Sequence, residues 1–111
     1  MQNITDWITN LQQTKDLILV EGKKDKLALE KLDIKNIITL DKPLYEIVES
    51  ITRKTIILTD LDAHGKKLYA YFKNNLQKRG IKVDPKFREF LFTNTKLTQI
   101  EGLTKYLEKF D

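Results

Sequence analysis

Four short apolar runs alternate along the chain with segments of helical spacing. The apolar runs occupy residues 16–20, 36–40, 55–59 and 81–83, and each has the length of a buried strand. Between them, hydrophobic residues recur every three or four positions, which is typical of a helix packed on one side. This alternation predicts βαβ units, and therefore a parallel sheet that is covered by helices on both faces.

Capping residues indicate where the helices begin and end. Asn3 is expected to cap the first helix, Asp41 the third, and Thr98 with Glu101 to form a capping box for the last. Gly80 is expected to end the fourth helix. The predicted helices cover about ten residues after Asn3, then residues 23–32, 41–51, 64–78, 84–92 and 98–110. The aromatic residues expected in the core rather than on a recognition surface are Trp7, Tyr69, Phe72, Phe90 and Phe92.

Three carboxylates follow the first and third predicted strands. Glu21 comes directly after residues 16–20, and Asp60 and Asp62 come after residues 55–59. In open α/β sheets, ligands bind at the carboxyl ends of strands, where the strand order reverses. We therefore expect a four-stranded parallel sheet of order 2-1-3-4, because only adjacency of strands one and three brings Glu21 to the aspartates.

The type of these side chains indicates a hard cation. Oxygen ligands without His or Cys suit Mg²⁺, with Mn²⁺ and Ca²⁺ behind it. A cation between Asp60 and Asp62 would offset their mutual repulsion, and Mg²⁺ commonly completes its shell with water and phosphate oxygens. The competing interpretation is that each aspartate merely caps a helix and that Glu21 is a solvated turn residue.

Composition narrows the class of protein. A chain of 111 residues with 41% hydrophobic and 32% charged residues is long enough for one domain with a single core. No apolar run approaches the roughly 18 residues of a membrane span, and no signal-peptide pattern opens the chain. Because there is no cysteine, disulfides and thiolate metal sites are excluded, and a cytoplasmic location is expected.

Basic residues gather beside the same predicted edge, although the net charge is only +4. From residue 63 to residue 83 there are six basic residues and no acidic one. On the predicted helix 64–78, Lys67 and Lys78 share a face with Tyr71, which suits a phosphate backbone; a solvated helix face is the alternative. Two glycines at the strand-to-helix turns could admit a phosphate or simply serve the turns. The candidate phosphate-binding residues are Gly22, Lys23, Lys24, Gly65, Lys66, Lys67 and Lys78.

Two stretches of the sequence carry a family resemblance. "LILVEGKKDKLAL" and "IILTDLDAHGKKL" resemble the two signature motifs of the Toprim domain, the catalytic module of topoisomerases, DnaG-type primases, OLD-family nucleases and RecR-type repair proteins. The family pattern is a glutamate and glycine after the first strand, here Glu21-Gly22, and T-D-x-D-x-x-G after a later strand, here Thr59 to Gly65. The resemblance covers about residues 16–83. It is strongest to the small stand-alone Toprim proteins and to the Toprim ribonuclease that matures ribosomal RNA.

The resemblance implies a fold and a chemistry. We expect residues 1–111 to form a single Toprim domain with a Rossmann-like fold, its core extended by an N-terminal helix and C-terminal helices. The family binds Mg²⁺ through the aspartates, here Asp60 and Asp62, and uses the glutamate, here Glu21, as general acid or base. Because a carboxylate beside a dication should stay ionised, a ligand or base role is favoured for Glu21.

The resemblance leaves two functional hypotheses. The first is Mg²⁺-dependent phosphodiester chemistry on RNA or DNA, as a nuclease or nucleotidyltransferase in RNA processing or DNA repair. The second is a non-catalytic, nucleic-acid-binding or regulatory module that works with a protein partner. No membrane partner is expected. His64 stands at a variable position of the motif, and we expect its presence there to be incidental.

Overall fold

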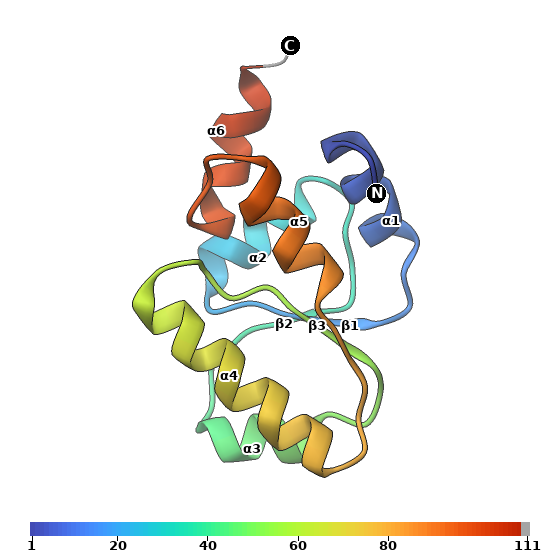
Figure 1. The fold of residues 1–111 in the computed structure, drawn as a ribbon, viewed down its shortest axis with the longest axis vertical. Coiled ribbons are helices and arrows are strands. Elements are labelled where there is room, and N and C mark those ends of the chain that lie inside the picture. Colours follow the sequence, from blue (N-terminus) through green and yellow to red (C-terminus); the bar gives the residue numbers. More distant parts are fainter. Residues whose placement is uncertain (110–111) are drawn as a thin grey trace.

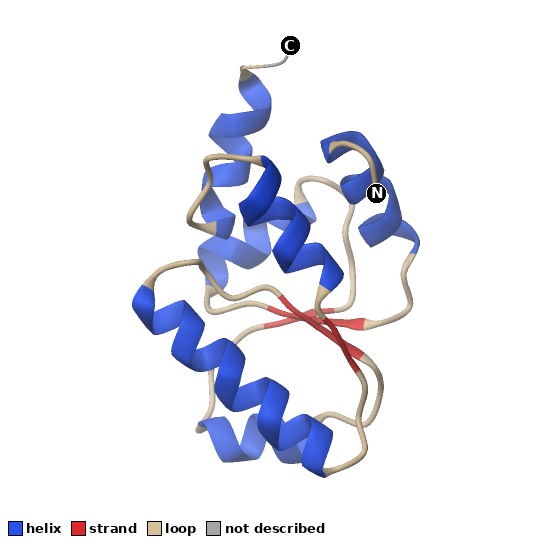
Figure 2. Ribbon diagram, in the orientation of Figure 1, coloured by secondary structure: helices blue, strands red, loops and turns tan. Residues whose placement is uncertain are grey.

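The computed structural model describes residues 1–109 and is built around a parallel sheet of four strands. These are β1 (Leu17–Leu19), β2 (Ile37–Ile38), β3 (Thr55–Ile57) and β4 (Val83–Asp84). Their order is β2-β1-β3-β4, and all neighbours are parallel, which confirms the predicted α/β fold and strand order. Figure 2 shows the strands as a layer with helices on both sides.

The strands are shorter than the apolar runs that predict them. Hydrogen bonding nevertheless continues past the strand ends, since the Val20 N–H donates to the Ile38 carbonyl and the Leu58 N–H donates to the Leu19 carbonyl. The fourth strand also lies later than residues 81–83, because β3 pairs with Val83 and Asp84. The apolar runs therefore include extended residues on either side of each short ladder.

Six α-helices surround the sheet within residues 1–109. α3 (Leu44–Ser50) and α4 (Ala63–Lys78) lie on one face, and the other four helices lie on the opposite face (Figure 1). Those four are α1 (Ile4–Gln13), α2 (Lys23–Glu30), α5 (Lys86–Asn94) and α6 (Leu103–Glu108). A 3₁₀ turn, η1 (Ile100–Gly102), leads directly into α6.

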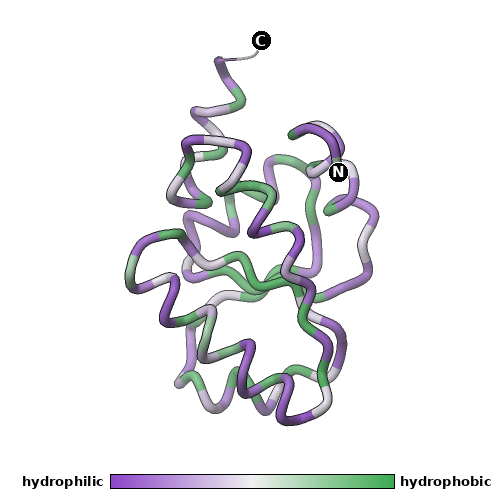
Figure 3. The backbone as a smooth tube through the Cα atoms, viewed as in Figure 1, coloured by the Kyte–Doolittle hydropathy of each residue, from purple (hydrophilic) through white to green (hydrophobic). Residues whose placement is uncertain are grey.

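Alternation along the strands produces two cores. Ile18 and Val20 of the first strand segment face the core under α1, α2 and α5, whereas Leu19 faces the core under α3 and α4. The same alternation places Ile56 and Ile57 on opposite faces, as the two-residue period of a strand requires. The strands are accordingly the most continuously hydrophobic part of the backbone trace in Figure 3.

The aromatic residues divide between the core and its margin. Trp7 is fully buried, and its indole N–H donates to the Phe87 carbonyl at 2.9 Å. Phe72 is also fully buried, as predicted. The other aromatic residues expected in the core are half-buried at its margin: Tyr69, Phe90 and Phe92.

Two of the predicted helix caps are wrong. α3 begins at Leu44 with Pro43 at the N-cap and no side-chain capping bond, so Asp41 lies outside the helix. The last helical segment begins as a 3₁₀ turn after Gln99, and its N-cap makes no side-chain bond, so Thr98 does not form a capping box. The end predicted near residue 110 for this helix lies outside the described residues.

Other helix ends follow the prediction. The Asn3 side chain accepts a hydrogen bond from the Asp6 N–H at 2.9 Å and caps α1. After α4, Gly80 adopts a positive φ of 76°, the left-handed conformation that glycine favours at the end of a helix.

Within residues 1–109, none of the helices combines the length and the apolar character needed to cross a membrane.

Candidate functional site

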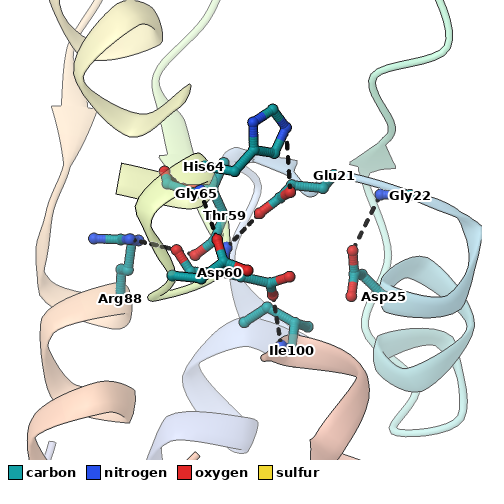
Figure 4. A network of polar contacts seen from close by, with 10 residues as sticks. Glu21, Gly22, Asp25, Thr59, Asp60, His64, Gly65, Arg88 and Ile100 are labelled. Carbon is teal, nitrogen blue, oxygen red and sulfur yellow. Dashed lines mark hydrogen bonds and ion pairs between the residues drawn. The ribbon is translucent and has the colours of Figure 1, made fainter. Parts of the chain in front are cut away.

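The strand order brings Glu21 and Asp60 together at the carboxyl ends of β1 and β3. The Asp60 N–H donates to Glu21 Oε2 at 2.7 Å, across a sequence separation of 39 residues (Figure 4). The side chain of Glu21 is 17% exposed, so one carboxylate oxygen is held by the backbone while the group keeps access to solvent. Glu21 and Asp60 therefore lie next to each other, as the predicted order of the strands requires.

The two aspartates are also held by backbone N–H groups. Asp60 is 9% exposed, and its Oδ1 accepts a hydrogen bond from the Ile100 N–H at 2.9 Å. Asp62 is exposed, and its Oδ1 accepts from the Gly65 N–H at 2.8 Å, which makes it the N-cap of α4. Asp62 therefore caps the helix that it precedes, as the competing interpretation of the sequence proposed, whereas Asp60 holds a turn 40 residues away in the sequence.

Gly65 is required by a close approach of the backbone. A Cβ atom at this position would lie 2.0 Å from the Asp60 carbonyl oxygen, a contact that only a backbone shift could relieve. The Thr59 hydroxyl donates to the Gly65 carbonyl at 2.7 Å and ties the first turn of α4 to the end of β3. The spacing from Thr59 to Gly65 is thus explained by packing, and the Gly65 N–H is already bonded to Asp62.

Gly22 contrasts with Gly65. No heavy atom lies within 4 Å of a Cβ built there, and its φ of −149° is extended backbone that any residue adopts. Its N–H donates to Asp25 Oδ2 at 3.1 Å. The fold gives no steric reason for a glycine at this position.

Two further acids lie beside the predicted ones and were not predicted as site residues. Asp25 is 7% exposed in the first turn of α2, where it bonds Gly22, and Glu101 lies in η1, which packs against α2. The glycine-x-x-aspartate spacing at the start of α2 could have indicated the role of Asp25 as a cap. No sequence pattern near Glu101 indicates that the turn carrying it packs on this edge.

Burial and mutual repulsion raise the pKa values of three of these carboxyl groups. Burial is the main cause of the raised pKa of Glu21, and the charges of Asp60 and Asp62 add to it. The pKa of Asp60 is raised by burial and then by the charges of Asp25, Asp62 and Glu101. The pKa of Asp25 is raised in the same way, with burial as the largest cause. The site therefore favours a compensating positive charge.

Arg88 provides one such charge, and the sequence analysis missed it. From α5 its Nε donates to the Thr59 carbonyl at 2.9 Å and its Nη2 donates to the Asp60 carbonyl at 2.6 Å (Figure 4). The guanidinium lies 4.8 Å from the centre of the Tyr69 ring and 5.5 Å from that of Phe92. Burial lowers the pKa of Arg88, while the charges of Glu21, Asp60 and Asp62 act in the opposite direction.

His64 lies closer to the acids than expected. Its Nε2 is 4.0 Å from Glu21 Oε1, although 75% of its side chain is exposed (Figure 4). Among the basic residues, Lys23, Lys24, Lys66 and Lys67 are exposed near the starts of α2 and α4, next to the acidic edge.

Lys78 is placed differently. It lies in the last turn of α4, eleven residues after Lys67, so it stands about 16 Å further along the helix axis. Tyr71, on the same helix, is half-buried and packs edge-on against Phe72 at 5.3 Å. The predicted basic face is therefore long, and its aromatic residue is partly in the core.

The donor set fits a hydrated Mg²⁺ better than a closed cage. Within residues 1–109, no three His, Cys, Asp or Glu side chains are grouped closely enough to hold a metal ion by themselves. In the same part of the chain, the second carboxylate oxygens of Asp60 and Asp62 accept no hydrogen bond. One or two carboxylates with water and phosphate are the usual shell of protein-bound Mg²⁺, and these residues match that requirement.

Comparison with known proteins identifies the family. A profile of the Toprim domain matches residues 15–85. The chain belongs to the Toprim domain family. A UPF0292 protein of Methanocaldococcus jannaschii is 39% identical over 100 residues, which cover 83% of this chain and 78% of that protein. A UPF0292 protein of Pyrococcus abyssi is 36% identical over 88 residues, which cover 76% and 67% of the two chains.

A solved structure shares the fold of this Toprim domain. It is a protein of Aquifex aeolicus with a TM-score of 0.80 and 37% sequence identity, and the match covers 91% of this chain and 98% of that one. Toprim domains generally bind Mg²⁺, and the family connects this chain with a metal-binding, nucleic-acid-related function. The profile ends at residue 85, so Arg88, Ile100 and Glu101 reach the acidic edge from outside the matched segment.

Proposed function

We propose that this Toprim domain catalyses Mg²⁺-dependent phosphodiester chemistry on RNA or DNA, as a nuclease or nucleotidyltransferase. The observation that carries the proposal is the 2.7 Å hydrogen bond from the Asp60 N–H to Glu21, which joins the two motifs at one edge of the sheet. This bond sets a partly exposed carboxylate of the first motif directly against Asp60 of the second.

Each acid has a distinct role in this proposal. Asp60 and Asp62 would hold Mg²⁺ through the carboxylate oxygens that their capping bonds leave available. The bound ion supplies Lewis-acid stabilisation of charge on the phosphate oxygens. Glu21 acts as general base, since one of its oxygens is fixed by Asp60 and the carboxylate remains partly exposed toward an incoming hydroxyl group or water.

Exposed lysines support the choice of nucleic acid as substrate. Lys23 and Lys24 follow Glu21, and Lys66 and Lys67 follow Asp62, so basic side chains stand on both sides of the acids. Non-specific contacts of lysine with phosphates supply most of the affinity in such binding. Gly22 fits the same proposal, because the open space beside it allows close approach of a phosphate.

Two observations favour the second candidate function, a nucleic-acid-binding or regulatory module without catalysis. Both aspartates already cap helical turns, and within residues 1–109 no three potential ligands are grouped for a metal. In that case the acids would serve mainly to fix the turns after β1 and β3, and a protein partner would supply any reaction.

Cleavage assays with matched variants test the proposal. Structured RNA, single-stranded DNA and duplex DNA are incubated with Mg²⁺ or Mn²⁺ and the wild type, Asp60→Asn or Glu21→Gln. We expect turnover by the wild type that both variants abolish, whereas a binding module would turn over none of these substrates. Asp16→Asn is the control, because Asp16 pairs with Lys54 at 3.7 Å at the start of β1, away from the acids.

Glu21→Gln also separates the two candidate functions. In an enzyme this near-isosteric change should stop turnover while nucleic acid still binds. In a binding module it should change little. If no nucleic acid is turned over by the wild type and Glu21→Gln binds as the wild type does, the catalytic proposal is wrong.

A further inference from the structure

In the described part of the chain, Arg88 forms hydrogen bonds with backbone carbonyls that follow β3 and not with a carboxylate. Within residues 1–109 it makes no ion pair with an acid, and its two hydrogen bonds go to consecutive carbonyls, those of Thr59 and Asp60. The flanking rings of Tyr69 and Phe92 keep the planar guanidinium in place. The hydrogen bonds of this charged side chain therefore hold two backbone carbonyl groups in place.

One of these carbonyls belongs to the peptide group that bonds Glu21. The Thr59 carbonyl accepts from Arg88 Nε at 2.9 Å, and the Asp60 N–H of the same peptide donates to Glu21 Oε2 at 2.7 Å. Arg88 and Glu21 therefore bond opposite ends of one peptide unit. A cationic donor on the carbonyl polarises the peptide and strengthens the bond that its N–H donates to the carboxylate.

The next peptide is held in a similar way. Its carbonyl, that of Asp60, accepts from Arg88 Nη2 at 2.6 Å, and its N–H, that of Leu61, donates to the Thr98 carbonyl at 2.8 Å. The same Asp60 carbonyl points at the space that Gly65 leaves by lacking a Cβ atom. Both peptide groups around Asp60 are therefore fixed from two sides.

We infer that Arg88 is a positioning residue, which orients Glu21 and Asp60 through these two peptide groups without touching metal or substrate. The orienting role itself does not depend on the proposed function, but its expected effect on Mg²⁺ binding rests on that function. Lysine keeps the positive charge but cannot reach two carbonyls with a planar fork. Arg88→Lys therefore removes the geometry and keeps the charge.

The first readout needs no ligand. In the wild type, the Asp60 amide should show a downfield proton shift and slow solvent exchange in nuclear magnetic resonance spectra. In Arg88→Lys that proton should move upfield and exchange faster, while the Gly65 amide, which bonds Asp62, should stay as it is. The second readout is calorimetry with Mg²⁺, where we expect affinity to fall about 10-fold, as when groups that orient metal ligands are lost.

Arg79 offers a matched control. It donates from Nη1 to the carbonyls of Val48 and Ile51 at the end of α3, so it also joins two backbone carbonyls, but at a helix end on the other side of the sheet. Arg79→Lys should lower thermal stability and leave the Asp60 amide and Mg²⁺ affinity as in the wild type.

The outcomes separate this inference from the proposed function. An unchanged Asp60 amide and unchanged Mg²⁺ affinity in Arg88→Lys would overturn the inference, as would equal weakening of Mg²⁺ binding by Arg79→Lys. If the wild type binds no Mg²⁺ but its Asp60 amide responds to Arg88→Lys, the proposed function fails and the positioning role stands. If Arg88→Lys does not fold, hydrogen exchange of the wild type still tests the inference, because an Asp60 amide that exchanges freely with solvent would contradict it.

Discussion

The two strand ends that build the acidic edge each carry a glycine, and the fold needs only one of them. A Cβ at Gly65 would lie 2.0 Å from the Asp60 carbonyl oxygen, whereas a Cβ at Gly22 would meet no heavy atom within 4 Å. The end of β3 is therefore shaped by packing, and the turn after β1 has room that packing does not use. Gly22 is the N-cap of α2, a position that favours glycine over alanine without requiring it.

The largest effect on stability should come from adding a methyl group at Gly65. Gly65→Ala should destabilise the protein by about 3 kcal/mol or more, because the methyl group clashes with backbone rather than with a side chain that can move. Gly22→Ala should cost about 1 kcal/mol or less, because the methyl group meets no heavy atom and only the preference of the α2 N-cap for glycine over alanine is lost. Urea unfolding of both variants measures the difference in stability. Equal losses in the two variants would contradict the conclusion that only the turn after β3 requires a glycine.

The next effect concerns the charges beside these turns. Asp60→Asn with Asp62→Asn should abolish the rise in melting temperature that Mg²⁺ gives the wild type, because the proposed ligands lose their charge. Equal stabilisation by Mg²⁺ in wild type and double variant would contradict the proposed metal site.

Without Mg²⁺, the same double variant should be more stable than the wild type at neutral pH. The pKa of Asp60 is raised above its ordinary 3.8 and that of Glu21 above its ordinary 4.5, so folding disfavours their ionised forms. Their contribution to stability is fully present below these ordinary values and is lost as pH rises through the raised ones. The gain should therefore vanish in unfolding measurements near pH 3.5, below both values.

A smaller effect should appear at Gly22 when nucleic acid is bound. Gly22→Val should leave the protein folded, since the position is open. It should weaken binding of nucleic acid by about 10-fold if a phosphate approaches the backbone there, a loss of about 1.4 kcal/mol. Filter binding or fluorescence anisotropy with Gly22→Ala beside it measures the dependence on size. Wild-type affinity in Gly22→Val would show that no phosphate comes close.

The smallest effect belongs to the basic face of α4. Each phosphate contact contributes about 0.7 to 0.9 to the slope of log affinity against log salt, so changing Lys67 and Lys78 to alanine should reduce that slope by roughly 1 to 2. Because both side chains are exposed, folding and Mg²⁺ binding should stay as in the wild type. An unchanged slope would mean that nucleic acid lies elsewhere, such as along Lys23 and Lys24 beside Gly22.

Local patterns in the sequence determined the elements and their order. Apolar runs of strand length, helical spacing between them and the acids at two strand ends predicted the parallel sheet β2-β1-β3-β4 and the meeting of Glu21 with Asp60. The elements were predictable because periodicity depends on residues close together in the chain, and the order followed from requiring that the acids at two strand ends meet.

Only the tertiary structure decided how the acids are held. Ile100, 40 residues after Asp60, donates the N–H that caps its carboxylate, and Arg88, 28 residues after it, bonds its carbonyl. The predicted cap at Thr98 failed for the same reason, since the Ile100 N–H bonds the distant Asp60 carboxylate instead of a local side chain. The sequence around a single arginine or backbone N–H does not indicate which carbonyl or carboxylate that group will bond. Those partners are set by how α5 and η1 pack across β3, which depends on the whole core rather than on neighbouring residues.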